Sequence, residues 1–400
     1  MSYQFIQTSL ELKLYIESIR SAKWIALDTE FVTEGNKSRL CLVQIASSSG
    51  LALIDATLVT DLSPFWERVC DKKTTLIVHA ARGDMEFCFR SIGRFPQKLF
   101  DIQLASGFVS TEFPSSYKNI VKKYLNVNLS KNETRTNWKR RPLSQLQIEY
   151  ALDDVRYLEP LASLLKKKMK ELNRYSWFKE ETKRSLQLLE DACLEDHWRQ
   201  IKGVRNCSRR ELAIVRGVWN WRQRIAAFWK KTPSKILRND LILEIAKRKS
   251  ADIERVISIQ GIREYLKNDA LVMLCEVIRD ALLLEENDLP ELKDVQQTSS
   301  ATCNILTHFI MTALNQIANQ ENIAITILAT HQDIRAAVLT RINHLSPDDL
   351  LSKLDHGWRV KFFGPLIDEL IAGKIALRIA EEGSKQPLQW LKIKKEELEN

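Results

Sequence analysis

The sequence predicts an α/β domain followed by a long helical half. Up to about residue 172, short apolar runs of strand character alternate with segments of helical spacing, which is typical of a sheet covered by helices. After Gly203 the strand signals nearly vanish. A chain of 400 residues, 44% of them hydrophobic, is long enough for two or three buried cores. We therefore expect one sheet domain and two all-α domains.

The sheet domain has a marked helix start and four strand signals. Thr8 and Glu11 form the pattern of a capping box, at which a helix begins. The apolar runs predict strands near residues 24–28, 39–47, 51–54 and 75–78.

Two acids follow the first of these strands. Asp28 and Glu30 come directly after Ile25–Leu27 and stand two residues apart. Side chains at i and i+2 of a strand share one face, so both carboxylates point the same way. Like charges so close favour a cation between them, and Mg²⁺ or Mn²⁺ suits oxygen ligands.

Two further positions add to this pair. Asp84 falls on the first turn of a helix after the strand near 75–78, where it also suits the helix macrodipole. Tyr150 and Asp154 stand at i and i+4 on one face of a later helix, although a tyrosine there also suits a buried core position. The nearby His79 is better interpreted as a packing residue at a strand end than as a ligand, because Mg²⁺ prefers oxygen ligands.

Together, Asp28-x-Glu30, Asp84 and Tyr150-x-x-x-Asp154 resemble the three motifs of the DEDDy 3′–5′ exonucleases. The stretches Asp28–Val32 and Arg135–Leu143 are similar to bacterial ribonuclease D. In the second half, Trp221-Arg222 and His356–Arg359 resemble helicase-and-RNase-D C-terminal (HRDC) domains.

The resemblance implies a ribonuclease H-like exonuclease domain, two HRDC-like domains and a site for two divalent cations, Mg²⁺ or Mn²⁺. In that site Asp28 bridges both cations, Glu30 and Asp154 complete the site on the side of the nucleophile, and Asp84 holds the second cation through water. Tyr150 orients the attacking water. Its hydroxyl has an ordinary pKa of about 10 and is protonated at neutral pH, so it is better suited to position the water than to accept a proton.

Two local departures from the family pattern occur. Asp153 stands beside Asp154, but neighbouring helical residues diverge by about 100°, so only one can share the face of Tyr150. We expect that one to be Asp154. Gly83 places a flexible residue just before Asp84, where the family often has a longer polar side chain.

The formal charge of +9 is concentrated in one stretch. Residues 199–249 hold 15 Lys or Arg against three acids, a net charge of +12. Four tryptophans lie in or beside this stretch, and cations interleaved with aromatics suit a nucleic-acid backbone with unstacked bases. The alternative is a solvated helical face with the tryptophans in the core. The tryptophans are Trp198, Trp219, Trp221 and Trp229.

Composition divides the chain into four parts. We expect the exonuclease domain over 1–172, a helical connector over 173–203, and HRDC-like domains over 204–288 and 298–382, separated by the polar linker 285–300. The seven cysteines are scattered and never form a C-x-x-C pair, which argues against a zinc site or a disulfide framework. With no membrane-length apolar run and no signal peptide, we expect a cytoplasmic monomer.

We therefore expect an enzyme that trims the 3′ ends of structured RNAs such as tRNA precursors and releases nucleoside 5′-monophosphates. Arg135, Trp138 and Arg141, ahead of the catalytic helix, are expected to line the path of the 3′ end. With these contacts to the 3′ end, residues 1–203 alone should still degrade short single strands. A DNA exonuclease is the alternative enzyme, and an RNA-binding scaffold without activity is the alternative from another class.

Overall fold

The structure, a computed structural model, describes residues 2–34, 37–129, 136–194, 197–229, 231–265, 268–290, 301–343, 352–382, 384 and 386–393. The chain forms two compact units. The first comprises residues 1–32, 40–190 and 299–400, and the second comprises residues 33–39 and 191–298. The last hundred residues therefore belong to the same compact unit as the sheet.

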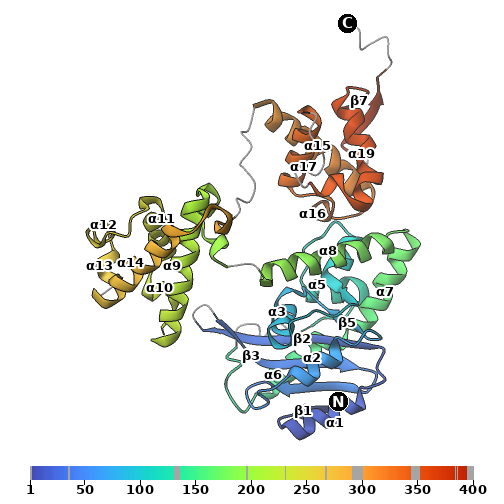
Figure 1. The fold of residues 1–400 in the computed structure, drawn as a ribbon. Coiled ribbons are helices and arrows are strands. Elements are labelled where there is room, and N and C mark those ends of the chain that lie inside the picture. Colours follow the sequence, from blue (N-terminus) through green and yellow to red (C-terminus); the bar gives the residue numbers. More distant parts are fainter. Residues whose placement is uncertain are drawn as a thin grey trace. The chain divides into compact units, whose positions relative to one another are not determined.

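A six-stranded mixed sheet lies at the centre of the first unit (Figure 1). The strand order is β1-β4-β3-β2-β5-β6; β3 and β4 are antiparallel, whereas β1–β4, β2–β5 and β5–β6 are parallel pairs. The four predicted strands are confirmed. The edge strands β1 and β6 were not predicted, because β6 has only three residues and the four residues of β1 include the polar Gln4, whereas the equally short β5 contains a continuous apolar run. The strands are β1 (Tyr3–Ile6), β2 (Trp24–Glu34), β3 (Lys37–Ser47), β4 (Gly50–Asp55), β5 (Thr75–Val78) and β6 (Leu99–Asp101).

Helices cover both faces of this sheet. Ile25 and Leu27 of β2 are fully buried in a cluster with residues of α1, α2 and α3, whereas Ala26 joins the cluster formed with α4, α5 and α7. The helices are α1 (Ser9–Ser18), α2 (Ser63–Val69), α3 (Arg82–Ile92), α4 (Ile102–Gly107), α5 (Tyr117–Leu125), α6 (Gln145–Arg156), α7 (Leu158–Glu171) and α8 (Tyr175–Leu194). The capping box of Thr8 and Glu11 is present at the start of α1.

The last helices share a core with the sheet domain. One buried apolar cluster contains Phe108 and Phe178 as well as Leu314 and Trp358. After these helices comes a β-hairpin that the sequence did not predict. The elements are α15 (Ala301–Gln320), α16 (Ile325–Leu328), α17 (His331–Ile342), η4 (Lys353–Asp355), α19 (Gly357–Ile371), β7 (Ile375–Ile379) and β8 (Leu388–Lys392).

The described part of the second unit is helical apart from its loops and residues 33–34 and 37–39 of the sheet strands. Its core contains Trp198 and Trp221, which are 1% and 2% exposed, so the core interpretation holds for these two tryptophans. No helix within the described ranges is long and apolar enough to cross a membrane. The elements are η1 (His197–Gln200), η2 (Val204–Asn206), α9 (Arg209–Phe228), α10 (Pro233–Ile236), α11 (Asn239–Arg248), α12 (Ile253–Ile257), α13 (Ile262–Tyr265), α14 (Asn268–Leu283) and η3 (Glu286–Asp288).

Candidate active site

The centre of the site is the strand β2. Its alternation buries Ile25 and Leu27 on one face and leaves Asp28 and Glu30 on the face that also carries Ala26. The strands β3 and β5 flank β2 on either side, so its backbone is held within the sheet. The two carboxylates therefore project from a rigid surface.

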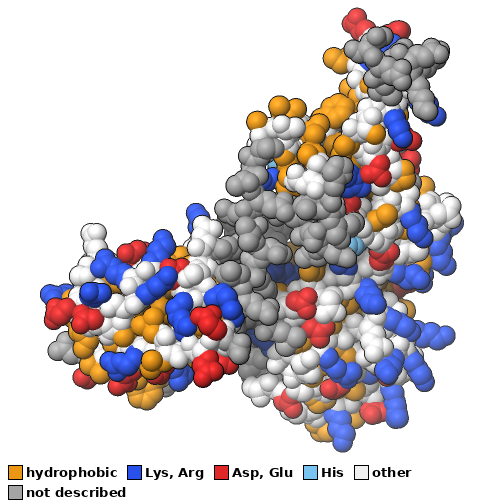
Figure 2. Space-filling view, turned by 45° about the horizontal axis from the view of Figure 1, so that its top comes forward, with side chains coloured by type: hydrophobic (Ala, Val, Ile, Leu, Met, Phe, Trp, Pro, Cys, Tyr) orange, Lys and Arg blue, Asp and Glu red, His pale blue; other side chains and the backbone are white. Residues whose placement is uncertain are grey.

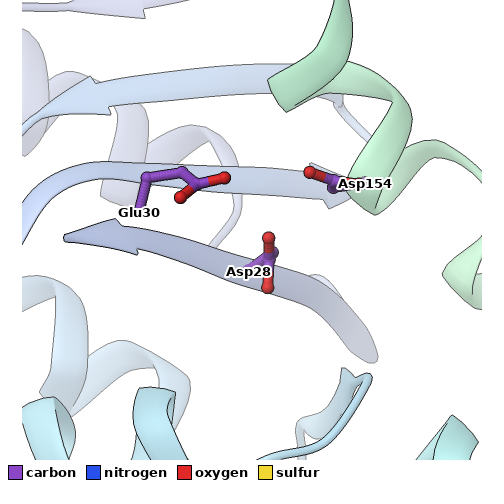
Figure 3. A group of neighbouring side chains, drawn as sticks. All are labelled: Asp28, Glu30 and Asp154. Atoms are coloured by element: carbon purple, nitrogen blue, oxygen red, sulfur yellow. The ribbon is translucent and has the colours of Figure 1, made fainter. Parts of the chain in front are cut away.

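The helix α6 supplies the third acid. Ser144 caps the helix and forms a capping box with Gln147, which fixes where the helix begins. Tyr150 and Asp154 then follow on one face. One carboxylate oxygen from each of Asp28, Glu30 and Asp154 lies within 4.8 Å of the other two (Figure 3).

These three acids are half-buried and close enough to repel one another. Burial raises the pKa of Asp28 to about 7, and burial together with the charge of Asp28 raises that of Glu30 to about 8. Asp154 has a pKa raised to about 9 by burial and by the charges of Asp28 and Glu30. A cation bound between the carboxylates would relieve this repulsion, and three hard oxygen donors fit a divalent ion such as Mg²⁺ or Mn²⁺.

Asp84 lies apart from this point of convergence. It is on the first turn of α3, is 5% exposed, and its Oδ1 accepts a hydrogen bond of 2.6 Å from the hydroxyl of Thr29. Burial and the charge of Asp28 raise the pKa of Asp84 well above its ordinary value. Thr29, between the two acids of β2, was missed by the sequence reasoning, because strand alternation directs its side chain away from theirs.

Tyr150 has the properties of a group that holds a proton. Burial, followed by the charges of Asp154, Glu30 and Asp28, raises the pKa of its hydroxyl above the ordinary value, so it remains protonated at neutral pH. Hydrogen bonding by Tyr150 also partly offsets the rise in the pKa of Asp154.

The neighbours of these residues have other partners. Asp153 accepts a hydrogen bond of 2.5 Å from Arg156, and its backbone carbonyl accepts one of 3.1 Å from the Tyr117 hydroxyl. His79 lies with Nε2 at 3.0 Å from the carbonyl oxygen of Ser115. It is Asp154, and neither of these residues, that joins the group of converging carboxylates.

Two of the three residues expected to bind RNA make contacts within the protein instead. Arg135 lies outside the described residues. Trp138 is 2% exposed, and its ring centroid lies 6.1 Å from that of Tyr150. Arg141 donates two hydrogen bonds to Asp55, so its guanidinium is engaged inside the protein. The structure thus buries the Trp138 ring and pairs Arg141 with Asp55, and these contacts with the rest of the protein point to a task other than the expected contact with RNA.

The comparisons with known proteins agree with this geometry. A model of the 3′–5′ exonuclease family matches residues 3–170, and a model of the HRDC domain matches residues 211–278. Ribonuclease D of Bartonella henselae is 30% identical over 389 residues, which cover 94% of this chain and 92% of the relative. Ribonuclease D of Escherichia coli is 28% identical over 380 residues, which cover 93% of this chain and 99% of the relative.

A solved structure matches as well. The crystal structure of E. coli RNase D, described as an exoribonuclease involved in structured RNA processing, superposes with a TM-score of 0.75 at 26% identity and covers 93% of this chain and 99% of that one. The length of the match, together with the converging carboxylates, leads to one conclusion: the chain belongs to the ribonuclease D family of 3′–5′ exoribonucleases.

Proposed function

We propose that the enzyme removes nucleotides one at a time from the 3′ ends of structured RNAs such as tRNA precursors and releases nucleoside 5′-monophosphates. The convergence of Asp28, Glu30 and Asp154 on one point, with pKa values raised by burial and, for Glu30 and Asp154, also by neighbouring charges, carries this proposal. The printed role of the E. coli relative in structured RNA processing supports the choice of substrate.

Each residue of the site has a defined task in this proposal. Two divalent cations, Mg²⁺ or Mn²⁺, would supply Lewis acidity that activates water and stabilises charge on the leaving oxygen. Asp28 would bridge the two cations. Glu30 and Asp154 would complete the site on the side of the nucleophile, and Asp84 would act through water on the other side. The protonated hydroxyl of Tyr150 would orient the attacking water by a hydrogen bond.

Matched RNA and DNA oligonucleotides labelled at the 5′ end test this function. We expect a ladder of shortened RNA with Mg²⁺ and no shortening in excess EDTA. Asp154→Asn should slow cleavage by about three orders of magnitude, because the carboxylate takes part in metal-ion catalysis. Asp153→Asn is the matched control and should cleave at nearly the normal rate. Turnover in EDTA, or a dead Asp153→Asn beside an active Asp154→Asn, would contradict the assignment, and equal cleavage of DNA would widen the substrate class.

We further propose that the second unit holds the RNA at an aromatic surface formed by Phe228 and Trp229. These side chains are 82% and 41% exposed at the end of α9, and the Lys231 ammonium lies 5.6 Å from the Trp229 ring centroid. Exposed aromatic faces beside cations stack on unpaired bases, which contributes about 1–3 kcal/mol per base. Figure 2 shows basic and acidic side chains intermixed on this unit, so charge alone does not mark one face.

Several basic residues of the 199–249 stretch are paired with other groups of the protein, some of them at its surface. Lys249 pairs with Glu211 and Arg248 with Glu244, while Arg222 donates to the carbonyl oxygen of Leu237. We therefore assign the RNA contact to the exposed aromatics rather than to the whole stretch.

The double substitution Phe228→Ala/Trp229→Ala tests this surface. It should weaken binding of a tRNA precursor by about tenfold or more while leaving cleavage of a short single strand unchanged, because stacking is lost and all the acids proposed for catalysis are kept. Leu283→Ala removes another highly exposed apolar side chain of the same unit and serves as the control. Equal affinity of the double variant and the Leu283→Ala protein would remove the surface from the proposal.

A further inference from the structure

An ion pair that is bidentate and largely buried joins the end of strand β4 to the segment before α6. Arg141 Nη2 donates to Asp55 Oδ1 at 2.7 Å, and Arg141 Nε donates to Asp55 Oδ2. The side chain of Asp55 is fully buried and that of Arg141 is 21% exposed. Burial would raise the pKa of Asp55, but hydrogen bonds from Arg141 and Thr57 outweigh it and hold the pKa below its ordinary value. The pair is therefore charged.

The same guanidinium also joins two pieces of backbone. Arg141 Nη2 donates to the carbonyl oxygen of Cys41 in β3 at 3.0 Å, and Nη1 donates to that of Trp138 at 2.7 Å. One side chain thus holds strands β3 and β4 against the segment that leads into α6. The anchored segment is close to the helix, since Ser144, the N-cap of α6, is three residues after Arg141.

Trp138 transmits this fixed position to the catalytic helix. It belongs to a buried cluster with Leu53 of β4 and with Ala151 and Leu152 of α6, and Tyr150 packs against the same cluster. The rings of Trp138 and Tyr150 lie 6.1 Å apart between centroids at 38°. Gln147 adds a further tie, because its Nε2 donates to the Thr136 hydroxyl at 3.0 Å.

We infer that Asp55, Arg141 and Trp138 are positioning residues that fix the hydroxyl of Tyr150 relative to Asp28, Glu30 and Asp154. This inference rests on the proposed role of Tyr150 as the group that orients the attacking water. A displacement of about 1 Å in such a group can lower the rate about a hundredfold. Arg141 acts here on the protein and not on the phosphates of RNA, since RNA binding by its guanidinium would leave the buried Asp55 carboxylate without its partner.

Three variants of the full chain test the inference: Asp55→Asn, Arg141→Lys and Trp138→Leu. With a short single-stranded RNA labelled at its 5′ end and saturating Mg²⁺, each should lower kcat about tenfold or more and leave KM within about twofold. Trp138→Phe keeps a ring against Tyr150 and should retain most of the activity. Asp55→Asn is the sharpest variant, because it keeps the cation of Arg141 and removes only the charge of a carboxylate that also accepts hydrogen bonds from Thr57.

Arg341→Lys is the matched control. Arg341 forms an ion pair of 2.7 Å with Asp355 in the last helices, and the two side chains are 19% and 5% exposed, close to the values of Arg141 and Asp55. The control should lose a similar amount of thermal stability and keep its kcat. A loss of kcat in Arg341→Lys equal to that in Arg141→Lys would show that general destabilisation causes the effect.

A double-mutant cycle with Tyr150→Phe separates positioning from a broader structural role. When Tyr150 no longer has a hydroxyl to position, adding Arg141→Lys or Trp138→Leu should lower kcat by less than about threefold. An equal loss in both backgrounds, or a raised KM with unchanged kcat, would overturn the inference, and the second result would restore the RNA contact. Should Arg141→Lys not fold, the pair Trp138→Leu and Trp138→Phe carries the same test. If Tyr150→Phe itself cleaves at the normal rate, the proposed function of Tyr150 fails first.

Discussion

At the scale of single residues, burial makes the three converging acids both costly and useful. Their pKa values, raised to about 7, 8 and 9, mean that ionising all three without a cation opposes folding. A group whose pKa is higher in the folded than in the unfolded state contributes stability at low pH, and that stability is lost as pH rises through the folded pKa. The metal-free protein therefore loses stability as the pH rises from about 4 to about 9.

The upward direction of these pKa shifts predicts how metal binding depends on pH. The melting temperature of the metal-free enzyme should fall between pH 6 and pH 9, and the rise produced by Mg²⁺ should grow over the same range, because protons and Mg²⁺ compete for the same carboxylates. Differential scanning calorimetry with and without Mg²⁺ at several pH values measures both quantities.

The control for this prediction is again the neighbouring acid. Asp154→Asn removes one of the three titrating groups and should flatten the pH dependence, whereas Asp153→Asn should preserve it. A Mg²⁺ effect that is the same at pH 6 and pH 9 would argue against binding by these acids.

At the scale of elements, a buried ion pair fastens α19 to α8. The guanidinium of Arg359, 2% exposed, pairs with Glu181 at 2.8 Å and donates to the carbonyl oxygens of Ile327 and Leu328. In addition, the rings of Trp358 and Trp177 stack at 4.5 Å. These contacts connect an element after residue 350 with one that follows the sheet domain directly.

Arg359→Met should therefore destabilise the protein by about 3–5 kcal/mol, because it leaves the Glu181 carboxylate and two carbonyl groups without this partner. Chemical denaturation followed by circular dichroism measures the change. The control is Arg20→Met, which breaks an ion pair whose side chains are 81% and 61% exposed and should change stability by less than about 1 kcal/mol. Similar losses in the two variants would show that the Arg359 network contributes little.

At the scale of the whole molecule, the shared core changes the expectation for truncated chains. The sequence suggested that residues 1–203 would work alone. In the structure, Phe108 and Phe178 of the first part are buried in one cluster with Leu314 and Trp358 of the last part. Removing the last part would expose this apolar surface to water, at a cost of about 25 cal/mol for each Å².

We predict that residues 1–194 alone are insoluble or bind a hydrophobic dye, and that co-expression with residues 299–400 rescues them. The two pieces should co-purify and digest a short single strand, since they rebuild the common core. Size-exclusion chromatography and the cleavage assay report the result. A fragment 1–194 that unfolds cooperatively, with the stability of the full chain, would show that the two parts are independent.

The sequence by itself determined the sheet domain and four of its strands, and it selected the five residues that we propose for catalysis. These depend on local periodicity: alternation places Asp28 and Glu30 on one face of a strand, and helical spacing does the same for Tyr150 and Asp154. The structure adds that three of the acids converge, which the order of residues alone did not establish.

Only the tertiary structure decided the contacts of Trp138 and Arg141, the hydrogen bond between Thr29 and Asp84, and the union of the last helices with the sheet domain. Asp55 and Arg141 stand 86 positions apart, and Arg359 lies beyond residue 350 while its partner Glu181 follows the sheet domain. No local pattern encodes such pairs. A basic and aromatic segment has the same composition whether it faces RNA or a buried carboxylate, and the partner that folding brings to it decides between the two.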